Sequence, residues 1–334
     1  MKYCIYMLRF LTPVHFGNAE LGGKLEQVGL EYTSDSLFSA LCWELRNLGE
    51  TEYLASFCHK VSTGEIRFSD ALPYTKEGAE EDYAFYIPKP VCTIEPTVQQ
   101  KAATLVEVRK NATEQKQQKK MKYLRPSELQ AYITALQQGK SYVSSVELGK
   151  TDIIERVNCR GHEPLPYYVG TYAFRPNAGL YILMQYEDAA DQELIYRLLE
   201  ALGNTGIGGK RSSGLGKFLV EDPLFLEDEI GVFADDGILY RMLMNRTATQ
   251  YMSLSTVIPK ENEIPVVAAG QYMLRRRSGF TTGAGELKKR NSVYAIRSGS
   301  CFAKPLDGQM VVLDDSIEPP VWRNGKGLFV GLPI

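Results

Sequence analysis

The sequence predicts an α+β protein made of tandem ferredoxin-like (RRM-like) domains, with a glycine-rich loop and an inserted β-hairpin. Three observations support this fold class. A strand–helix–strand pattern occurs twice before residue 221, the stretch GNTGIGGKRSSGLG (203–216) follows the second of the two helices, and short strands dominate after residue 251.

The first strand–helix–strand unit occupies the amino-terminal part of the chain. Residues 2–11 (KYCIYMLRFL) are apolar on both faces, as expected of a central strand. A helix should begin at a capping Ser34 or Asp35 and end at Gly49, because leucines recur between them at helical spacing. A short strand follows within residues 64–74.

The second unit comprises a strand at 179–186 (GLYILMQY), an amphipathic helix at 189–202 and a strand at 215–220. Two such units in succession are the plan of a ferredoxin-like domain. This domain covers residues 1–228. The interval of about 75–178 is an insertion, because it is too long to be a loop.

The insertion contains two contrasting segments. Residues 109–122 (RKNATEQKQQKKMK) are polar and basic without a helical or strand period, so we expect them to be mobile. Residues 157–176 (VNCRGHEPLPYYVGTYAFRP) have two extended arms around a turn that contains Pro and Gly. This pattern predicts a β-hairpin over about 157–175.

The carboxy-terminal part has a different composition. The chain turns acidic after residue 222, and we place a domain boundary near residue 228. Residues 229–334 then form a β-rich second domain, which we interpret as a degenerate ferredoxin-like copy of the first. Its predicted strands lie in the segments YMSLSTVI, AGQYMLRRR, SVYAI and GLFVGL.

The composition indicates which ligands and which cellular location to expect. The chain of 334 residues has 38 Lys plus Arg and 40 Asp plus Glu, so a polyanion would have to bind at a local basic patch. Its six cysteines form no C-x-x-C pair, which predicts reduced thiols and neither a metal site nor a cofactor. No apolar run approaches the ~20 residues of a membrane helix, and the amino terminus lacks a signal-peptide cleavage site. We therefore expect a cytoplasmic protein with no membrane partner.

The glycine-rich segment 203–216 does not match the known nucleotide-binding loops. A P-loop needs Ser or Thr after its Lys, but Arg211 follows Lys210. The dinucleotide pattern starting at Gly206 fails as well, because Arg211 stands where the third glycine should be. A run of small residues with two adjacent cations instead predicts a cradle for a nucleic-acid backbone. The alternative is a helix C-cap at Gly203 followed by a flexible loop.

Several motifs together resemble the RAMP superfamily. Besides GIGGKRSSGLG, these are PVHFG after the first strand, SDSLFSALCWEL on the first helix, NAGLYIL on the third strand, and SGSCF and KGLFVGL near the carboxy terminus. Within the superfamily, the chain is similar, from residue 2 to about 332, to the fourth subunits of type III-A CRISPR effectors, the Csm complexes.

The resemblance implies a noncatalytic RNA-binding subunit for antiviral defence. Such a subunit holds the 5′ repeat-derived tag of the CRISPR RNA and joins the large polymerase-like subunit to the backbone RAMP filament. The resemblance also implies that the inserted hairpin is a thumb that kinks the guide RNA. Here the hairpin reads NCRGHEP and lacks the threonine-rich sequence often found in the family.

The resemblance further implies specific RNA contacts. His15 and Phe16, in the loop after the first strand, would stack on a base or bond to it, and a structural role for His15 is an equal alternative. Asn158 and Arg160 would grip the RNA at its bend, and Arg277 would extend the basic track, together with Arg275, Arg276, Lys288, Lys289 and Arg290. A solvated strand edge is an equal alternative for the arginines. The residues expected to contact phosphate or sugar are Gly206, Gly208, Gly209, Lys210, Arg211, Ser212 and Ser213.

Two other functions remain open from the sequence. The first is a RAMP-type endoribonuclease, for which His15 and Asp35 are the candidate catalytic residues. The position of Asp35 at a helix cap and the absence of a histidine partner near His15 argue against this alternative. The second is a structural adaptor that touches only protein. The near-neutral charge favours this function and the Lys-Arg glycine loop disfavours it.

Overall fold

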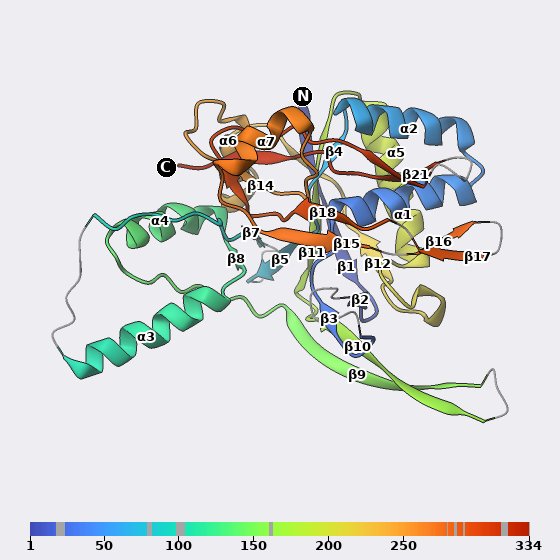
Figure 1. Cartoon of the computed structure of the whole chain (residues 1–334), viewed down its shortest axis with the longest axis horizontal. Helices are drawn as coiled ribbons and strands as arrows, with labels where there is room; N and C mark the ends of the chain where they lie inside the picture. Colours follow the sequence, from blue (N-terminus) through green and yellow to red (C-terminus); the bar gives the residue numbers. More distant parts are fainter. Residues whose placement is uncertain are drawn as a thin grey trace.

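The computed structural model describes residues 1–17, 24–78, 82–97, 104–159, 163–278, 280–283, 286–289, 291–314 and 320–333. Helices and strands are mixed, as the predicted α+β class requires. Both termini lie on the side of the molecule opposite the hairpin of β9 (Gly149–Asn158) and β10 (Leu165–Phe174) (Figure 1). No helix in the described ranges is long and apolar enough to span a membrane.

An antiparallel sheet forms the centre of the molecule. Its strands follow the order β12-β1-β11-β5-β6, with β13 also paired to β1 and β4 to β11. The longest pairing joins β1 to β11, from Lys2 opposite Tyr186 to Leu8 opposite Leu180. The strands are β1 (Lys2–Phe10), β4 (Arg67–Phe68), β5 (Leu72–Glu77), β6 (Asp82–Phe85), β11 (Ala178–Tyr186), β12 (Phe218–Val220) and β13 (Leu224–Leu226).

Three helices cover one face of this sheet. They are α1 (Ser34–Asn47), α2 (Thr51–Thr63) and α5 (Ala189–Thr205). Tyr6 of β1 and Ile182 of β11 point to this face, where they join Leu41 of α1 and Leu199 of α5 in one buried cluster. The central position predicted for residues 2–11 is confirmed, because the strand buries alternate side chains on both faces. The sequence analysis did not predict α2.

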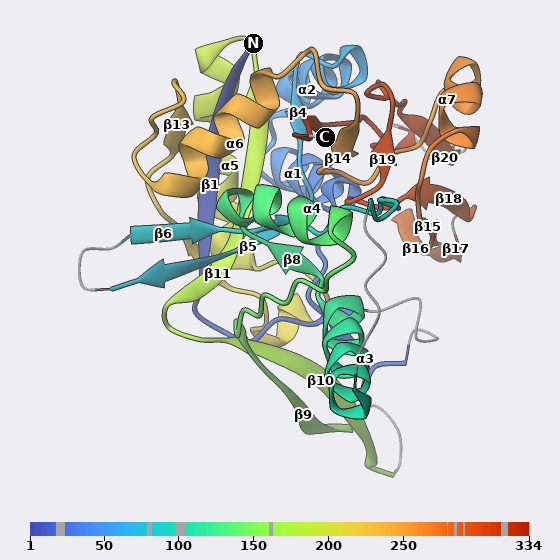
Figure 2. The ribbon, with the colours of Figure 1, turned by 90° about the vertical axis from the view of Figure 1, so that its left-hand side faces the viewer.

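The opposite face is covered largely by the carboxy-terminal part of the chain. Ile5 and Leu183 pack there with Leu239 of α6 (Ala234–Met244) and with Leu254 and Val330. The core therefore runs across the position near residue 228 where the sequence suggested a boundary. Figure 2 looks at this face, with α6 and the insertion helix α4 (Leu129–Gln137) in front of the central sheet.

Small antiparallel sheets make up the rest of the carboxy-terminal part. The strand β14 lies between β19 and β22, and the other described pairs there are β15–β18, β16–β17 and β20–β21. The elements are β14 (Tyr251–Ser253), η4 (Glu261–Glu263), α7 (Ile264–Ala268), β15 (Leu274–Arg277), β16 (Phe280–Gly283), β17 (Glu286–Lys289), β18 (Val293–Ile296), β19 (Cys301–Phe302), β20 (Val311–Asp314), β21 (Val321–Arg323) and β22 (Phe329–Gly331).

The insertion contains a helix that the sequence analysis did not predict. Residues expected to lack regular structure form α3 (Leu105–Lys120), which has no buried side chain. Thr104 and Glu107 form a capping box at its start, and Lys110 and Glu114 form an i,i+4 ion pair. Because good helix formers rather than an apolar stripe build this helix, periodicity could not reveal it. The neighbouring elements are β7 (Ile87–Pro88), β8 (Tyr123–Leu124) and η2 (Pro126–Glu128).

The predicted hairpin exists but is longer than expected. It pairs β9 (Gly149–Asn158) with β10 (Leu165–Phe174), so its first arm begins eight residues before position 157. The first arm was missed because its polar side chains do not alternate with apolar ones in the sequence. The hairpin and α3 extend from the same end of the molecule (Figures 1 and 2).

The start of α1 differs from the prediction. Thr33, not Ser34 or Asp35, occupies the cap position. The backbone N–H of Ser34 donates to the carboxylate of Asp70 at 2.8 Å, and the same carboxylate accepts from Thr256 N at 2.9 Å. Burial raises the pKa of Asp70. Asp70 therefore joins the start of α1 to the carboxy-terminal part of the chain.

Candidate nucleic-acid interface

The glycine-rich loop (203–216) leaves α5 and turns sharply before β12. Gly206, Gly208, Gly214 and Gly216 have φ angles of 82°, 86°, 83° and 78°, and Lys210 has the only positive φ among described non-glycine residues, 59°. A left-handed lysine costs free energy that the surrounding contacts must offset, so such residues often mark functional positions. The loop thus has a defined shape and ends in the short helix η3 (Arg211–Ser213).

The glycines allow the loop to pack closely on the protein itself. The N–H of Gly209 donates to His15 O at 2.8 Å, and the N–H of Gly206 donates to Leu202 O at 2.6 Å. A Cβ atom on Gly208 would lie 2.8 Å from His15 O, and one on Gly209 would lie 2.7 Å from His15 Cδ2. The amides of Gly206 and Gly209 are therefore committed within the protein, which corrects the expectation that they face RNA.

His15 joins the glycine-rich loop to the hairpin. Its Nδ1 lies 2.7 Å from the carbonyl oxygen of Gly170 on β10, and the ring is buried. Val14 and Tyr172 exchange two backbone hydrogen bonds of 2.9 Å beside it. The structural role considered for His15 is therefore the one that its contacts support.

Phe16 is a core residue. Its ring is 3% exposed and packs against Phe10 and Tyr32, with ring centroids 6.4 and 5.1 Å away. Because protein covers the ring, base stacking by Phe16 is not compatible with this packing, and that expectation is corrected.

Lys210 and Arg211 present the positive charge of the loop. The Lys210 ammonium lies 4.8 Å from the centroid of the Tyr167 ring on β10, which is a cation–π contact. Ser212 and Ser213 are exposed beside these two cations. The described loop therefore places two cations and two hydroxyls where a phosphodiester backbone could reach them.

A cavity of about 460 Å³ lies between this loop and α1. Arg211 and Gly208 line one side, and Ser36, Ser39 and Trp43 of α1 line the other. Trp43 and Arg211 also line an adjacent cavity of about 440 Å³ with Lys210 and Ser212. The cations of the loop thus face an open groove along the outer side of α1.

Arg277 reaches the same cavity but is paired with an acid. Its Nε lies 3.0 Å from Asp35 Oδ2, and its Nη2 donates to Ser36 Oγ at 2.8 Å. Arg323 also contacts Asp35, which is 2% exposed. Burial alone would raise the pKa of Asp35, but Arg277 and Arg323 outweigh it and lower that pKa. Arg277 is therefore a partner of Asp35 at the edge of this cavity, and its contribution to a basic track for RNA stays a prediction.

The remaining candidate RNA-binding residues differ in exposure and in their bonding partners. Asn158 ends β9 opposite Leu165 and is exposed near the tip of the hairpin. Arg275 pairs with Glu31, and Arg276 donates to Ser292 Oγ at 3.2 Å. Lys288 and Lys289 belong to β17, whereas Arg160 and Arg290 lie outside the described residues.

Trp43 is the residue that the sequence analysis missed. Leu37, Leu41 and Leu45 face the core, whereas Trp43 is on the outer side of α1 with 45% of its surface exposed. A tryptophan out of phase with the leucine stripe of a predicted amphipathic helix would have been the signal.

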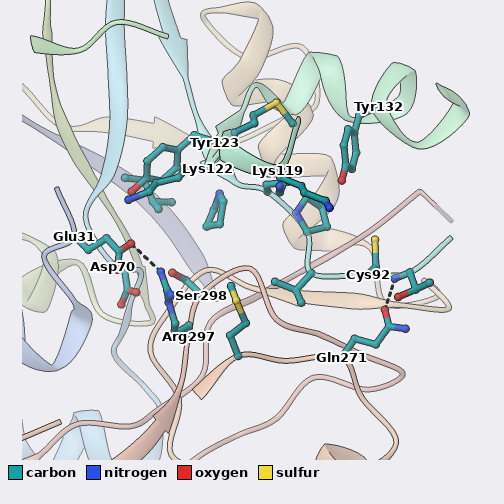
Figure 3. A pocket seen from close by; sticks show the side chains of 18 of the residues that line it. Glu31, Asp70, Cys92, Lys119, Lys122, Tyr123, Tyr132, Gln271, Arg297 and Ser298 are labelled. Atoms are coloured by element: carbon teal, nitrogen blue, oxygen red, sulfur yellow. Dashed lines mark hydrogen bonds and ion pairs between the residues drawn. The ribbon is translucent and has the colours of Figure 1, made fainter. Parts of the chain in front are cut away.

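A third cavity of about 500 Å³ lies between the insertion and the carboxy-terminal part (Figure 3). Arg297 bonds there to Glu31 at 2.9 Å, and Lys119 and Lys122 are exposed on the other side. Burial lowers the pKa of Lys89, whose ammonium donates to Gln118 O at 2.8 Å. No residue of the glycine-rich loop lines this cavity.

Comparison with models of known protein families shows the superfamily of this chain. The family model of the RAMP superfamily matches residues 7–219, and that of the CRISPR Csm4 C-terminal domain matches residues 246–332. The chain therefore belongs to the RAMP superfamily, as the resemblance of its motifs indicated.

The particular relatives are Csm4 proteins. The chain is 26% identical to the "CRISPR system Cms protein Csm4" of Streptococcus thermophilus over 317 residues, covering 93% of this chain and 92% of the relative. It is 26% identical to the protein of that name from Mycobacterium tuberculosis, covering 96% and 94%. The chain thus closely resembles the fourth subunit of the Csm complex.

Solved structures agree on the fold. A chain of the Csm3-Csm4 subcomplex of a type III-A interference complex matches with a TM-score of 0.62 at 17% identity, and both chains are covered completely. A chain of a Csm1-Csm4 cassette in complex with cA4 matches with a TM-score of 0.61 at 16% identity, covering 100% of this chain and 99% of the other. At these identities the likeness concerns the fold.

Proposed function

We propose that this chain is a noncatalytic RNA-binding subunit of a type III-A CRISPR effector complex in the cytoplasm. It holds the 5′ repeat-derived tag of the CRISPR RNA and joins a large polymerase-like subunit to the backbone RAMP filament. One observation carries the RNA-binding part. The left-handed Lys210 and its neighbour Arg211 face an open groove, next to a hairpin that extends from the body.

The proposed partners follow from the relatives. Solved complexes contain Csm4 with Csm3 in one case and with Csm1 in another, and their chains match this chain along its whole length. The order β12-β1-β11-β5 of the amino-terminal strands supports the ferredoxin-like plan of the first domain. The degenerate second copy in residues 229–334 stays a prediction.

The noncatalytic assignment rests on the two residues that a ribonuclease would need. His15 is buried and its Nδ1 is engaged by Gly170 O, while Asp35 is held between Arg277 and Arg323. Both groups are therefore already bonded within the protein, which supports the noncatalytic assignment. The protein-only adaptor is disfavoured by the free energy needed to hold Lys210 in a left-handed conformation beside Arg211.

Reconstitution tests the proposal. The large subunit, the backbone subunit and a CRISPR RNA with its tag are mixed with and without this chain, and complexes are separated by size. We expect the large subunit to join the RNA-loaded filament only when this chain is present. We also expect the RNA with its tag to increase the yield of the complete complex, whereas a tag-swapped RNA of equal length should not. Joining that is equally efficient without the chain would refute the linking role.

A further inference from the structure

Both tryptophans of the chain line one cavity. The sequence contains two, Trp43 and Trp322, and a cavity of about 670 Å³ between α1, α2 and β21 is bordered by both. Its other walls are mainly apolar, from residues that include Phe38, Leu54 and Val321. This volume lies in the range of small-ligand sites, about 300–1,000 Å³.

The cavity shares two lining residues with the groove at the glycine-rich loop. Ser39 and Trp43 line both this cavity and the one that Arg211 enters. Trp43 also borders the space next to Lys210. A chain whose phosphates lie at Lys210 and Arg211 would therefore have the Trp43 indole directly beside it.

The chemistry of the cavity suits a nucleobase. A base has two apolar faces that stack on aromatic rings and a polar edge that needs hydrogen-bond partners. Here two indoles and apolar walls are combined with Ser39 and Arg46 among the lining residues. A purely apolar occupant would leave the cationic side of the groove unused, whereas RNA uses both parts.

We propose that the Trp43–Trp322 cavity is a base-binding pocket for one unstacked nucleotide of the RNA that crosses the glycine-rich loop. The inference rests on the proposed RNA-binding function and adds the site that receives a base. Trp43 supplies the stacking surface at the mouth, and the wall formed by Trp322 limits how far the base enters. Arg211 holds the adjacent phosphate.

Tryptophan fluorescence tests the pocket directly, because no tryptophan lies elsewhere in the chain. The full chain is titrated with tag RNA and with tag RNAs carrying one abasic position each. We expect the intact RNA to quench the emission. We expect the abasic RNA that removes the inserted base to bind more weakly and to quench less than the others.

Trp43→Ala should weaken tag binding by roughly 5- to 140-fold, the range measured for one base stacked on an aromatic side chain. The salt dependence should not change, since no phosphate contact is lost. Trp43→Phe, which keeps an aromatic face, should recover most of the affinity. The matched control is Tyr53→Ala, because Tyr53 is 56% exposed on the neighbouring helix α2 but does not line the cavity.

Each other outcome has a defined meaning. Salt-dependent RNA binding with equal affinities for Trp43→Ala and Tyr53→Ala, and no quenching, would overturn the pocket but leave the proposed function standing. No binding of any RNA to the wild type would overturn both. If Trp43→Ala binds RNA normally but no longer retains the large or the backbone subunit, the cavity is a protein-docking site and this inference is wrong.

Discussion

The Lys210 ammonium lies 4.8 Å from the centre of the Tyr167 ring, and this contact connects the glycine-rich loop to the inserted hairpin. A second connection runs from the same loop through His15 to Gly170 on β10. The two elements expected to guide RNA are therefore fixed relative to each other before RNA arrives. Such preorganisation lowers the entropy lost on binding.

The double change Lys210→Ala with Arg211→Ala should weaken tag RNA binding and flatten its salt dependence. Each lost phosphate contact on single-stranded RNA lowers the slope of log K against log salt by roughly 0.7. The fold should survive, because surface substitutions usually change stability by about 0.5 kcal/mol or less. Fluorescence titrations at several salt concentrations, with a melting curve for each protein, make the measurement.

Lys210→Gly is the matched control for the backbone. Glycine adopts the φ of 59° without the penalty that a side chain incurs, so this variant should be at least as stable as the wild type. It should nevertheless bind RNA as weakly as Lys210→Ala. Equal affinities and salt slopes in all of these well-folded proteins would mean that the segment is only a helix end and a turn.

Asp35→Asn should destabilise the protein by about 3–5 kcal/mol, because it leaves Arg323 buried without its counter-charge. Urea unfolding curves give this difference. Glu114→Gln is the comparison, since Glu114 pairs with Lys110 at an exposed site on α3 and leaves no buried charge behind. We expect a smaller loss there. If the Asp35→Asn protein were as stable as the wild type, the ion pair between Asp35 and Arg323 would not stabilise the fold.

Acid should weaken the same ion pair in the wild type. The folded pKa of Asp35 is lowered, so its stabilisation is present above the unfolded value of about 3.9 and is lost as the pH falls through the folded value. Asp70, whose pKa is raised by burial, acts in the opposite sense. The quantity to measure is therefore the difference in unfolding free energy between wild type and Asp35→Asn, which should shrink below about pH 4.

The purified chain should not cleave CRISPR RNA or its precursor, with or without divalent metal. His15 and Asp35, the two candidate catalytic groups, are engaged by Gly170 O and by two arginines. Denaturing gels of end-labelled RNA provide the measurement. Defined products that disappear in the His15→Ala protein would show that this assignment is wrong.

The sequence was most informative where burial alone decides the structure. Residues 2–11 are apolar on both faces and form the central strand, and Leu37 and Leu41 correctly predicted the buried side of α1. It was least informative for contacts between distant residues. Asp35 and Arg277 are separated by 242 positions, so no local pattern indicates that they pair. The same limit explains why the glycines were assigned to RNA, since their close partner, His15, lies on another element.

Shortening the hairpin should change the path of the RNA more than its affinity. Glu155 and Tyr168 face each other across β9 and β10, so an Asn-Gly turn can join them and remove residues 156–167 while keeping the anchored base of the hairpin. The base should stay folded because Gly170 N donates to Leu25 O at 2.8 Å and Tyr172 pairs with Val14.

The phosphate contacts at Lys210 and Arg211 remain in this variant, so the affinity for tag RNA should fall by only a few-fold, about 1 kcal/mol or less for the lost cation–π contact with Tyr167. When a β-ribbon bends RNA, the neighbouring bases unstack, and contacts between the ribbon and the RNA offset that cost. Nuclease footprints of the assembled complex should therefore change next to the tag. Tyr167→Ala alone separates the two effects, because it removes the contact with Lys210 but keeps the ribbon. An unchanged footprint in the shortened protein would mean that the hairpin does not direct the RNA.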